Sequence, residues 1–370
     1  MPEGSTDRAI VLGDPTLRTW GDELSPAFLN ALFSAGMREI EQYRAVHGAD
    51  APLPPAEYLA ISGGGPDGAY GAGLLAGWSE AGTRPQFKLV TGISTGALSA
   101  PFAFLGSKYD AQLKKVYTST RTRDIMKERG MLAAVFDDAL ADTKPLEALL
   151  AKVLTDEMID EIATEYGKGR LLLIATTNLD ESRPVIWNIG AIAATKHPES
   201  KRLIRRVMIA SAAIPAAFPP VMFDVTVDGK KYQEMHVDGG ATAQLFLYPP
   251  SMNLRAQSAV AHFSRERHAY IIRNARLDAR WASVKRQTLS IAGRAVSALI
   301  QTQGVGDLYR VYITTQRDGV AYNLAYIPAT FDEKQAEEFD PVYMTKLFNV
   351  GFAAGKNGGN WEKRPPGLSE

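Results

Sequence analysis

One serine in this sequence stands in a pattern suited to nucleophilic catalysis. Residues 92–96 read Gly-Ile-Ser-Thr-Gly, after an apolar run at 87–90 that predicts a buried strand and before a predicted helix start. A serine at such a sharp turn holds its hydroxyl at a helix N-terminus, and Gly92 and Gly96 remove the Cβ atoms that would clash there. The pattern therefore predicts Ser94 as the nucleophile of an acyl transfer.

A second glycine-rich turn upstream could stabilise the negative charge of that reaction. Residues 62–68 read Ser-Gly-Gly-Gly-Pro-Asp-Gly, between a predicted strand and a helix of small residues that would pack closely on a sheet. Gly63, Gly64 and Gly65 let the backbone turn its N–H groups toward one point, which can hold an oxyanion or a phosphate. We predict that this turn is the oxyanion hole.

The same turn also fits a dinucleotide-binding fingerprint, Gly-x-Gly-x-x-Gly, through Gly63, Gly65 and Gly68. That fingerprint needs an acidic residue at the end of the second strand, about 20 residues further on, to bind the ribose. Here the second strand ends in residues 92–96, which include neither Asp nor Glu. The oxyanion interpretation is therefore favoured, and we expect no nucleotide cofactor.

An aspartate is a better candidate base for Ser94 than any histidine. Asp238 opens an Asp-Gly-Gly sequence after a predicted β-hairpin, 221–237, which has an Asp-Gly turn. His262 and His268 would complete a Ser–acid–His order, but their charged surroundings are typical of a surface loop. A carboxyl with an ordinary pKa of about 3.9 is a weak base at neutral pH, so such a dyad depends on its oxyanion hole. The alternative is a plain turn residue, since Asp-Gly commonly ends strands.

Taken in order, these motifs resemble those of the patatin-like phospholipases, and of a bacterial subgroup among them. The resemblance spans residues 58–240, about half of the chain. It rests on the glycine-rich loop at 63–65, Gly-x-Ser-x-Gly at 92–96, Asp-Gly-Gly at 238–240 and similar segments at 175–180 and 210–220.

The resemblance implies a serine acyl hydrolase of the carboxylic-ester type, whose chemistry needs no metal or cofactor. It assigns Ser94 as the nucleophile, Asp238 as the base, and Gly63, Gly64 and Gly65 to the oxyanion hole. The implied substrates are acyl esters of lipids, namely phospholipids, lysophospholipids or acylglycerols. Such substrates also imply transient contact with a membrane surface.

One position departs from the family pattern. The family loop usually carries Arg or Lys where this chain has Asp67, and a carboxylate there would repel an oxyanion or a phosphate. The resemblance therefore implies an acyl hydrolase more firmly than a phospholipase. The alternative is a catalytically silent lipid-binding protein with the same fold.

Strands and helices alternate around the motifs, which predicts an α/β fold, and the resemblance implies a three-layer α/β/α sandwich with a mostly parallel sheet. We expect an N-terminal extension with one helix at 1–55, a catalytic domain at 56–354 and a loose C-terminal tail at 355–370. Within the catalytic domain we expect a helical, cap-like insertion at 109–165, whose apolar run 131–136 contacts the acyl chain.

The composition narrows the classes of partner and site. Lys and Arg number 41, as do Asp and Glu, so the whole chain gives no electrostatic case for binding nucleic acid or a strongly anionic membrane. Cysteine is absent, which excludes disulfides and cysteine metal sites. No apolar run approaches about 18 residues and the polar start is not a signal peptide. We expect a soluble chain, cytoplasmic unless an export signal has been removed.

Overall fold

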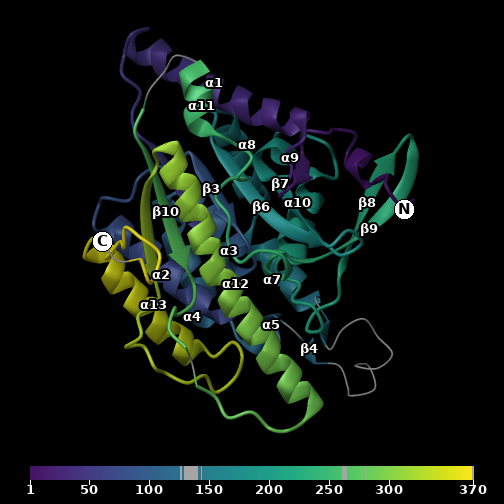
Figure 1. The fold of residues 1–370 in the computed structure, drawn as a ribbon, viewed down its shortest axis with the longest axis vertical. Helices are drawn as coiled ribbons and strands as arrows, with labels where there is room; N and C mark the ends of the chain where they lie inside the picture. The colour runs from purple at the N-terminus through teal and green to yellow at the C-terminus, as the bar shows by residue number, and fades with distance from the viewer. Residues whose placement is uncertain (126, 129–140, 143, 261–264, 280, 369–370) are drawn as a thin grey trace.

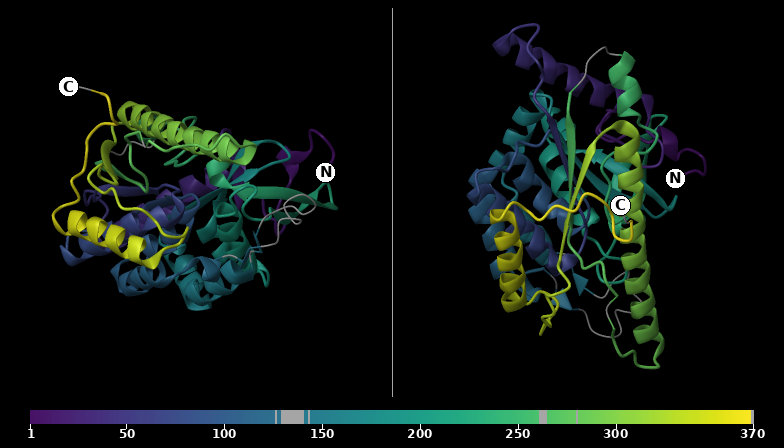
Figure 2. Two further views of the ribbon diagram at one scale, coloured as in Figure 1. Left: turned by 90° about the horizontal axis from the view of Figure 1, so that it is seen from below. Right: turned by 60° about the vertical axis from the view of Figure 1, so that its left-hand side comes forward.

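The computed structural model describes residues 1–125, 127–128, 141–142, 144–260, 265–279 and 281–368. A central sheet lies between two layers of helices, as the edge-on view in Figure 2 (left) shows. This is the predicted α/β/α sandwich with a mostly parallel sheet. The run 131–136, predicted to contact the acyl chain, lies outside the described residues.

Five parallel strands form the centre of the sheet, and β7 and then β1 extend it in antiparallel pairing beyond β6. The hairpin of β8 and β9 joins the sheet where β9 pairs with β6. In spatial order the strands are β1 (Arg18–Trp20), β7 (Arg183–Asn188), β6 (Leu171–Asn178), β3 (Leu89–Gly92), β2 (Ala56–Ile61), β10 (Arg267–Arg273) and β11 (Ala321–Tyr326), with the hairpin β8 (Val221–Val227) and β9 (Lys230–Asp238). A separate small sheet pairs β4 (Lys127–Glu128) with β5 (Ala141–Asp142).

Successive strand residues point to opposite faces, so each face has its own apolar core. In β2, for example, Leu59 and Ile61 belong to one core and Ala60 to the other. The first face is covered by α2 (Gly68–Glu80), α3 (Thr95–Leu105), α4 (Asp110–Ser119), α5 (Thr122–Ile125), α7 (Lys144–Val153), α8 (Asp156–Gly167), α9 (Ile189–Ala194), α10 (Ser200–Ser211) and α13 (Pro341–Lys356). The second is covered by α1 (Pro26–His47) and α12 (Thr288–Asp318), beside the short α11 (Leu254–Val260).

The small residues of α2 serve a helix partner as well as the sheet. A Cβ added at Gly71 would lie 3.0 Å from the Ile272 side chain of β10, as expected for packing on the sheet. A Cβ at Gly73 would instead lie 2.0 Å from the Phe348 carbonyl oxygen of α13, and Gly351 of α13 is equally close to the backbone of α2. The two helices therefore pack backbone against backbone, which only glycine allows.

Both ends of the chain are integrated into the sandwich. The N-terminal segment holds one α-helix, α1, and also supplies β1, which pairs with β7. The segment predicted as a loose tail packs instead, because the Trp361 ring lies 4.9 Å from the Trp78 ring and Glu362 forms a backbone bridge with Leu324 of β11. Within the segment 109–165, α4 packs on α2 and α8 packs on α3 and α9, so these helices belong to the helical layer.

Candidate active site

Ser94 occupies the sharp turn between β3 and α3 that its flanking residues predict. Its backbone has φ 55° and ψ −126°, a strained conformation for a residue with a side chain. A Cβ at Gly92 would lie 2.5 Å from the Gly96 carbonyl oxygen, and a Cβ at Gly96 would lie 2.2 Å from that of Ile61. The two glycines are therefore required for the chain to turn here.

A serine from another helix holds this turn in place. The Ser94 backbone N–H donates to the Ser211 hydroxyl oxygen at 3.1 Å, and the Ser211 hydroxyl donates to the Ala175 carbonyl of β6 at 2.7 Å. Ser211 lies in the segment 210–220 that carries the family resemblance, but its role could not be read from its residue type. It ties the nucleophile turn to the strand that neighbours β3.

Asp238 is brought to Ser94 by strand pairing. It is the last residue of β9 and pairs with Thr176 of β6, the strand beside β3. Its carboxylate accepts a hydrogen bond, 2.6 Å long, from the Gly240 N–H, and it lies close enough to the Ser94 side chain for that side chain to favour the charged form of the carboxyl. The structure thus places the two predicted residues together, in a setting where both are buried.

Burial changes the chemistry expected of Asp238. It raises the pKa of the Asp238 carboxyl to about 7, although the hydrogen bonds from Ser94 and Gly240 oppose the shift. At neutral pH the carboxylate is thus a much stronger proton acceptor than the weak base expected from an ordinary aspartate.

The histidines nearby have other partners. The His236 ring bonds Thr176 and Glu234, and the His268 ring lies 3.0 Å from the Glu57 carboxylate. His262, the other histidine considered as a base, lies outside the described residues. Among the described residues, the carboxylate next to the Ser94 side chain is that of Asp238.

The three glycines of the upstream turn have different roles. The Gly63 N–H donates to the Gln244 carbonyl at 3.1 Å, and a Cβ at Gly63 would lie 3.2 Å from the Ser94 Cβ. Gly63 therefore lets the loop pass close to the nucleophile, with its N–H already engaged. Within the described part of the chain, the N–H groups of Gly64 and Gly65 have no acceptor, so they can receive an oxyanion.

Asn274, which follows β10, anchors this loop and was missed in the sequence. Its backbone N–H donates to the Ser62 hydroxyl at 2.8 Å and its side-chain amide to the Ser62 carbonyl at 2.9 Å. A Cβ at Gly64 would lie 2.2 Å from the Asn274 carbonyl oxygen, so the loop and the β10 end fit tightly. Asn274 could have been recognised only from its place after β10, a strand that pairs with β2. The order of the strands in the sheet was unknown from the sequence.

Asp67, the departure from the family pattern, has partners of its own. The Tyr343 hydroxyl of α13 donates to its carboxylate at 2.6 Å. Burial lowers the pKa of Arg273, at the end of β10, to about 10, while the charges of Asp307 and Asp67 favour its charged form. The negative charge of Asp67 therefore lies within electrostatic reach of a buried cation.

Two cavities adjoin the dyad. One, of 60 Å³, is lined mainly by apolar side chains and reaches Gly65 and Thr95, next to the loop and the nucleophile. The other, of 560 Å³, is more polar and reaches Ile93 and Gly239, next to the nucleophile and the base. The chain neighbours of Ser94 and Asp238 thus line an apolar and a more polar space.

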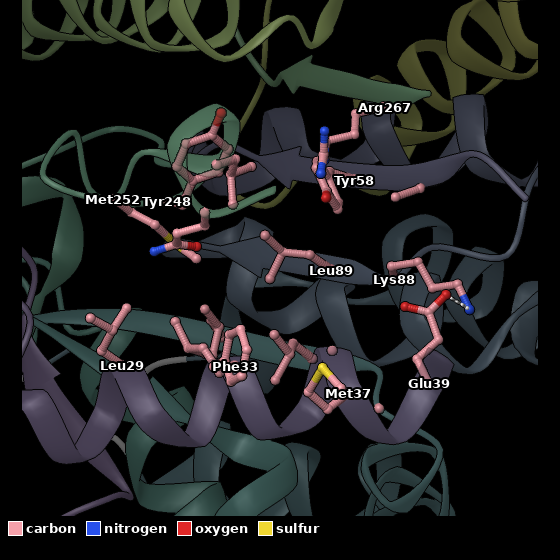
Figure 3. Close-up of a pocket in the computed structure, with 18 of the residues that line it drawn as sticks. Leu29, Phe33, Met37, Glu39, Tyr58, Lys88, Leu89, Tyr248, Met252 and Arg267 are labelled. Carbon is pink, nitrogen blue, oxygen red and sulfur yellow. Dashed lines mark ion pairs between the residues drawn. The ribbon is translucent and has the colours of Figure 1, made fainter. Parts of the chain in front are cut away.

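A further apolar groove of 360 Å³ lies at the opposite end of the sheet (Figure 3). Leu29, Phe33 and Met37 of α1 face Leu89 across it, and an ion pair between Glu39 and Lys88 closes one end at 2.8 Å. Most of its strand residues begin β2, β3, β6 and β10, whereas Ser94 follows the end of β3. The groove shares Ile186, Tyr248 and Pro249 with the more polar cavity beside Gly239.

The described residues contain no cluster of His, Asp and Glu side chains that could hold a metal ion. None of their helices combines the length and the apolar character needed to cross a bilayer.

Comparisons with known proteins agree with the motifs. The family model "Patatin", described as patatin-like phospholipase, matches residues 59–249, a span that contains the loop, Ser94 and Asp238. Solved structures that resemble the fold include VipD from Legionella pneumophila, with a TM-score of 0.41 and 10% sequence identity over 84% of this chain and 68% of that one. No curated protein sequence matches the chain.

Proposed function

Because the chain belongs to the patatin-like phospholipase family, whose members act on lipid acyl groups, we propose that it hydrolyses lipid acyl esters through a dyad of Ser94 and Asp238. The observation that carries the proposal is the buried Asp238 carboxylate beside the buried Ser94 side chain, which favours the charged form of that carboxyl. A strained serine on a strand-to-helix turn, next to a base of suitable pKa, is the arrangement that an acyl-enzyme mechanism needs.

In the acylation step, Asp238 accepts the Ser94 proton as the serine oxygen attacks the ester carbonyl. The oxyanion that forms is stabilised by the unengaged N–H groups of Gly64 and Gly65. Collapse of the tetrahedral intermediate breaks the bond to the leaving alcohol, which takes the proton from Asp238. The acyl group remains on Ser94 as an ester.

In the deacylation step, Asp238 takes a proton from a water molecule that attacks the acyl-Ser94 carbonyl. The serine leaves, regains a proton from Asp238 and releases a free fatty acid. Each turnover therefore uses one ester and one water and returns the dyad to its starting state.

We assign the acyl chain to the apolar cavity beside Thr95, whose lining includes Leu98, Leu150 and Val153. The more polar cavity beside Gly239 would receive the alcohol part of the substrate. The reaction class is a carboxylic-ester hydrolase, of the phospholipase A, lysophospholipase or esterase type.

The test is labelling with a fluorophosphonate probe together with hydrolysis of p-nitrophenyl esters and phospholipids. We expect the probe to label the wild type at Ser94, and the Ser94→Ala variant to lose both labelling and hydrolysis. Ser119→Ala, which removes an exposed hydroxyl on α4, should change neither. An unlabelled, inactive wild type that still binds lipid would instead support the silent lipid-binding alternative.

A further inference from the structure

The N-terminal half of α12 projects from the body of the protein, and its residues before Gln301 are largely exposed. Every residue from 291 to 300 is exposed, whereas the second half of α12 packs on the sheet through Leu308 and Val311. The start of α12 and the segment before it form the lower tip of the molecule in Figure 1, and Figure 2 (right) shows the same projection. We call residues 281–302 the arm.

The arm exposes large apolar side chains that a protein in water normally covers. Trp281 is 90% exposed, Leu299 69%, Ile291 54% and Val296 52%. Clustered exposure of this kind marks a surface that binds another protein or a lipid.

The apolar residues of the arm share one side of the helix. At about 100° per residue, Ile291, Val296 and Leu299 fall within an arc of about 140°. Ser290, Arg294 and Ser297 fall on the other side of the same helical turns. The arm is therefore amphipathic, with its apolar side open.

The charge of the arm is one-sided, in contrast to that of the whole chain. Lys285, Arg286 and Arg294 lie in the arm, and the sequence has no Asp or Glu between Asp278 and Asp307. A chain with equal numbers of acidic and basic residues thus concentrates positive charge next to exposed Trp, Leu and Ile side chains. From the balanced total charge we expected no attraction to an anionic membrane. The total does not show that this segment is locally basic.

The arm joins the body next to the dyad. Gln303, one residue beyond the arm, accepts a hydrogen bond from the Gln244 side-chain amide at 3.0 Å. That amide also donates to the Gly240 carbonyl at 2.8 Å, two residues from Asp238. The C-terminal end of the arm therefore lies at the edge of the site.

We propose that the arm docks the protein on an anionic lipid bilayer, with the apolar side of the helix in the headgroup–acyl boundary and the basic side chains against anionic headgroups. The proposal rests on the proposed function, because a hydrolase of lipid esters must reach substrate at such a surface. Charge complementarity selects the bilayer over a second copy of this chain packed arm against arm, since that pairing would bring the same basic side chains together, with no Asp or Glu between Asp278 and Asp307 to offset them.

The experiment is co-sedimentation of the full chain with vesicles of phosphatidylglycerol, compared with vesicles of phosphatidylcholine. Each basic residue near an anionic surface contributes a factor of about 5 in binding, so Lys285→Gln with Arg286→Gln should weaken binding to phosphatidylglycerol roughly 30-fold. Lys230→Gln with Lys231→Gln, an equal loss of charge on the exposed β8–β9 hairpin, should leave binding unchanged.

The apolar side is tested in the same assay. Leu299→Ser should weaken vesicle binding by roughly tenfold or more, because the leucine side chain no longer enters the bilayer. The matched control is Val342→Ser, since Val342 on α13 is 65% exposed but lies outside the arm. Equal binding by the arm variants and the wild type, or no binding of phosphatidylglycerol by the wild type, would overturn the proposal.

Further readouts separate this proposal from the proposed function. The arm variants should hydrolyse a soluble short-chain ester at the wild-type rate, and Ser94→Ala should bind vesicles as the wild type does. Persistent hydrolysis by Ser94→Ala would refute the dyad while leaving the vesicle result standing. A dimer in sedimentation velocity that Leu299→Ser abolishes, with unchanged vesicle binding, would assign the arm to a second copy and overturn docking.

Discussion

At the scale of single residues, the chemistry depends on where Asp238 is buried. The site leaves its carboxylate two hydrogen-bond donors, Ser94 and the Gly240 N–H, which do not compensate for the loss of water. Burial therefore raises the pKa of the Asp238 carboxyl, and in the proposed reaction this higher basicity lets the carboxylate accept the Ser94 proton. Its residue type and position were predictable, but its pKa of about 7 was not, because burial depends on strands that meet only in the fold.

The pH dependence of hydrolysis follows from that pKa. The base form of Asp238 is lost below about pH 7, so kcat/KM for a soluble p-nitrophenyl ester should fall about tenfold per pH unit on the acid side. Stopped-flow measurements of kcat/KM between pH 4.5 and 9 would show this fall on the acid side. A rate that stays level down to pH 5 would show that Asp238 keeps an ordinary pKa or is not the base.

The same pKa also predicts a stability cost. Folding raises the pKa of Asp238 from 3.8 to about 7, so the folded chain binds this proton more tightly and loses stability as the pH rises between those values. Asp238→Asn removes the buried charge and should raise the free energy of unfolding by roughly 2–4 kcal/mol at pH 8. At pH 4 urea denaturation should show little gain, and a variant equally stabilised at both pH values would contradict this cause.

At the scale of elements, the strand that carries Asp238 is clamped by a buried polar network. Arg18 of β1 forms a buried ion pair with Glu234 of β9, and its Nη2 lies 2.9 Å from the Glu234 Oε1. Burial alone would raise the pKa of the Glu234 carboxyl. Hydrogen bonds from Arg18 and His236 outweigh that effect and lower the pKa to about 2. The N-terminal segment, which the sequence separated from the catalytic domain, thus holds β9 in place.

The His236 ring completes this clamp in its neutral form. Burial lowers its pKa. The Trp187 indole N–H donates to the Thr176 hydroxyl, which leaves that hydroxyl to donate to His236 Nδ1. The protonated Nε2 of His236 then donates to Glu234 at 3.1 Å. A histidine two residues from the base is therefore structural.

Removing Arg18 should destabilise the buried polar network around Glu234. Arg18→Met leaves Glu234 buried without its cation and should cost roughly 3–5 kcal/mol of unfolding free energy at pH 7.5, measured in urea. Adding Glu234→Met should restore most of that loss, because the second change removes the uncompensated charge. A double variant as unstable as the single one would show that Arg18 acts through packing instead.

The close packing of α2 on α13 leads to a separate prediction about the free energy of unfolding. Gly73→Ala places a methyl group against the Phe348 backbone, which cannot move aside, and should cost roughly 1–3 kcal/mol. Gly36→Ala on α1, where a Cβ would meet nothing within 4 Å, should instead stabilise by roughly 0.5–1 kcal/mol. We expect the urea midpoint to fall for Gly73→Ala and to rise for Gly36→Ala. A shift in the same direction for both variants would contradict the close backbone packing of α2 on α13.

At the scale of the whole molecule, the sheet gathers residues from the full length of the chain at one edge. The Gly63–Gly65 loop and Ser94 follow parallel strands, and both were predictable because glycine patterns mark such turns. Ser211 and Asn274 were not, because only strand and helix order brings them to this edge. The exposure of residues 291–300 could not be predicted either, because it is a property of the packed structure.

The central claim is that the acyl group passes through Ser94 with Asp238 as the base. Its most direct test is the intact mass of the chain quenched during turnover of a p-nitrophenyl acyl ester, followed by peptide mapping. We expect an added acyl mass on the peptide that contains Ser94 in the wild type, and none in Ser94→Ala or Asp238→Asn. An acyl group on another residue, or steady hydrolysis by Ser94→Ala, would contradict it.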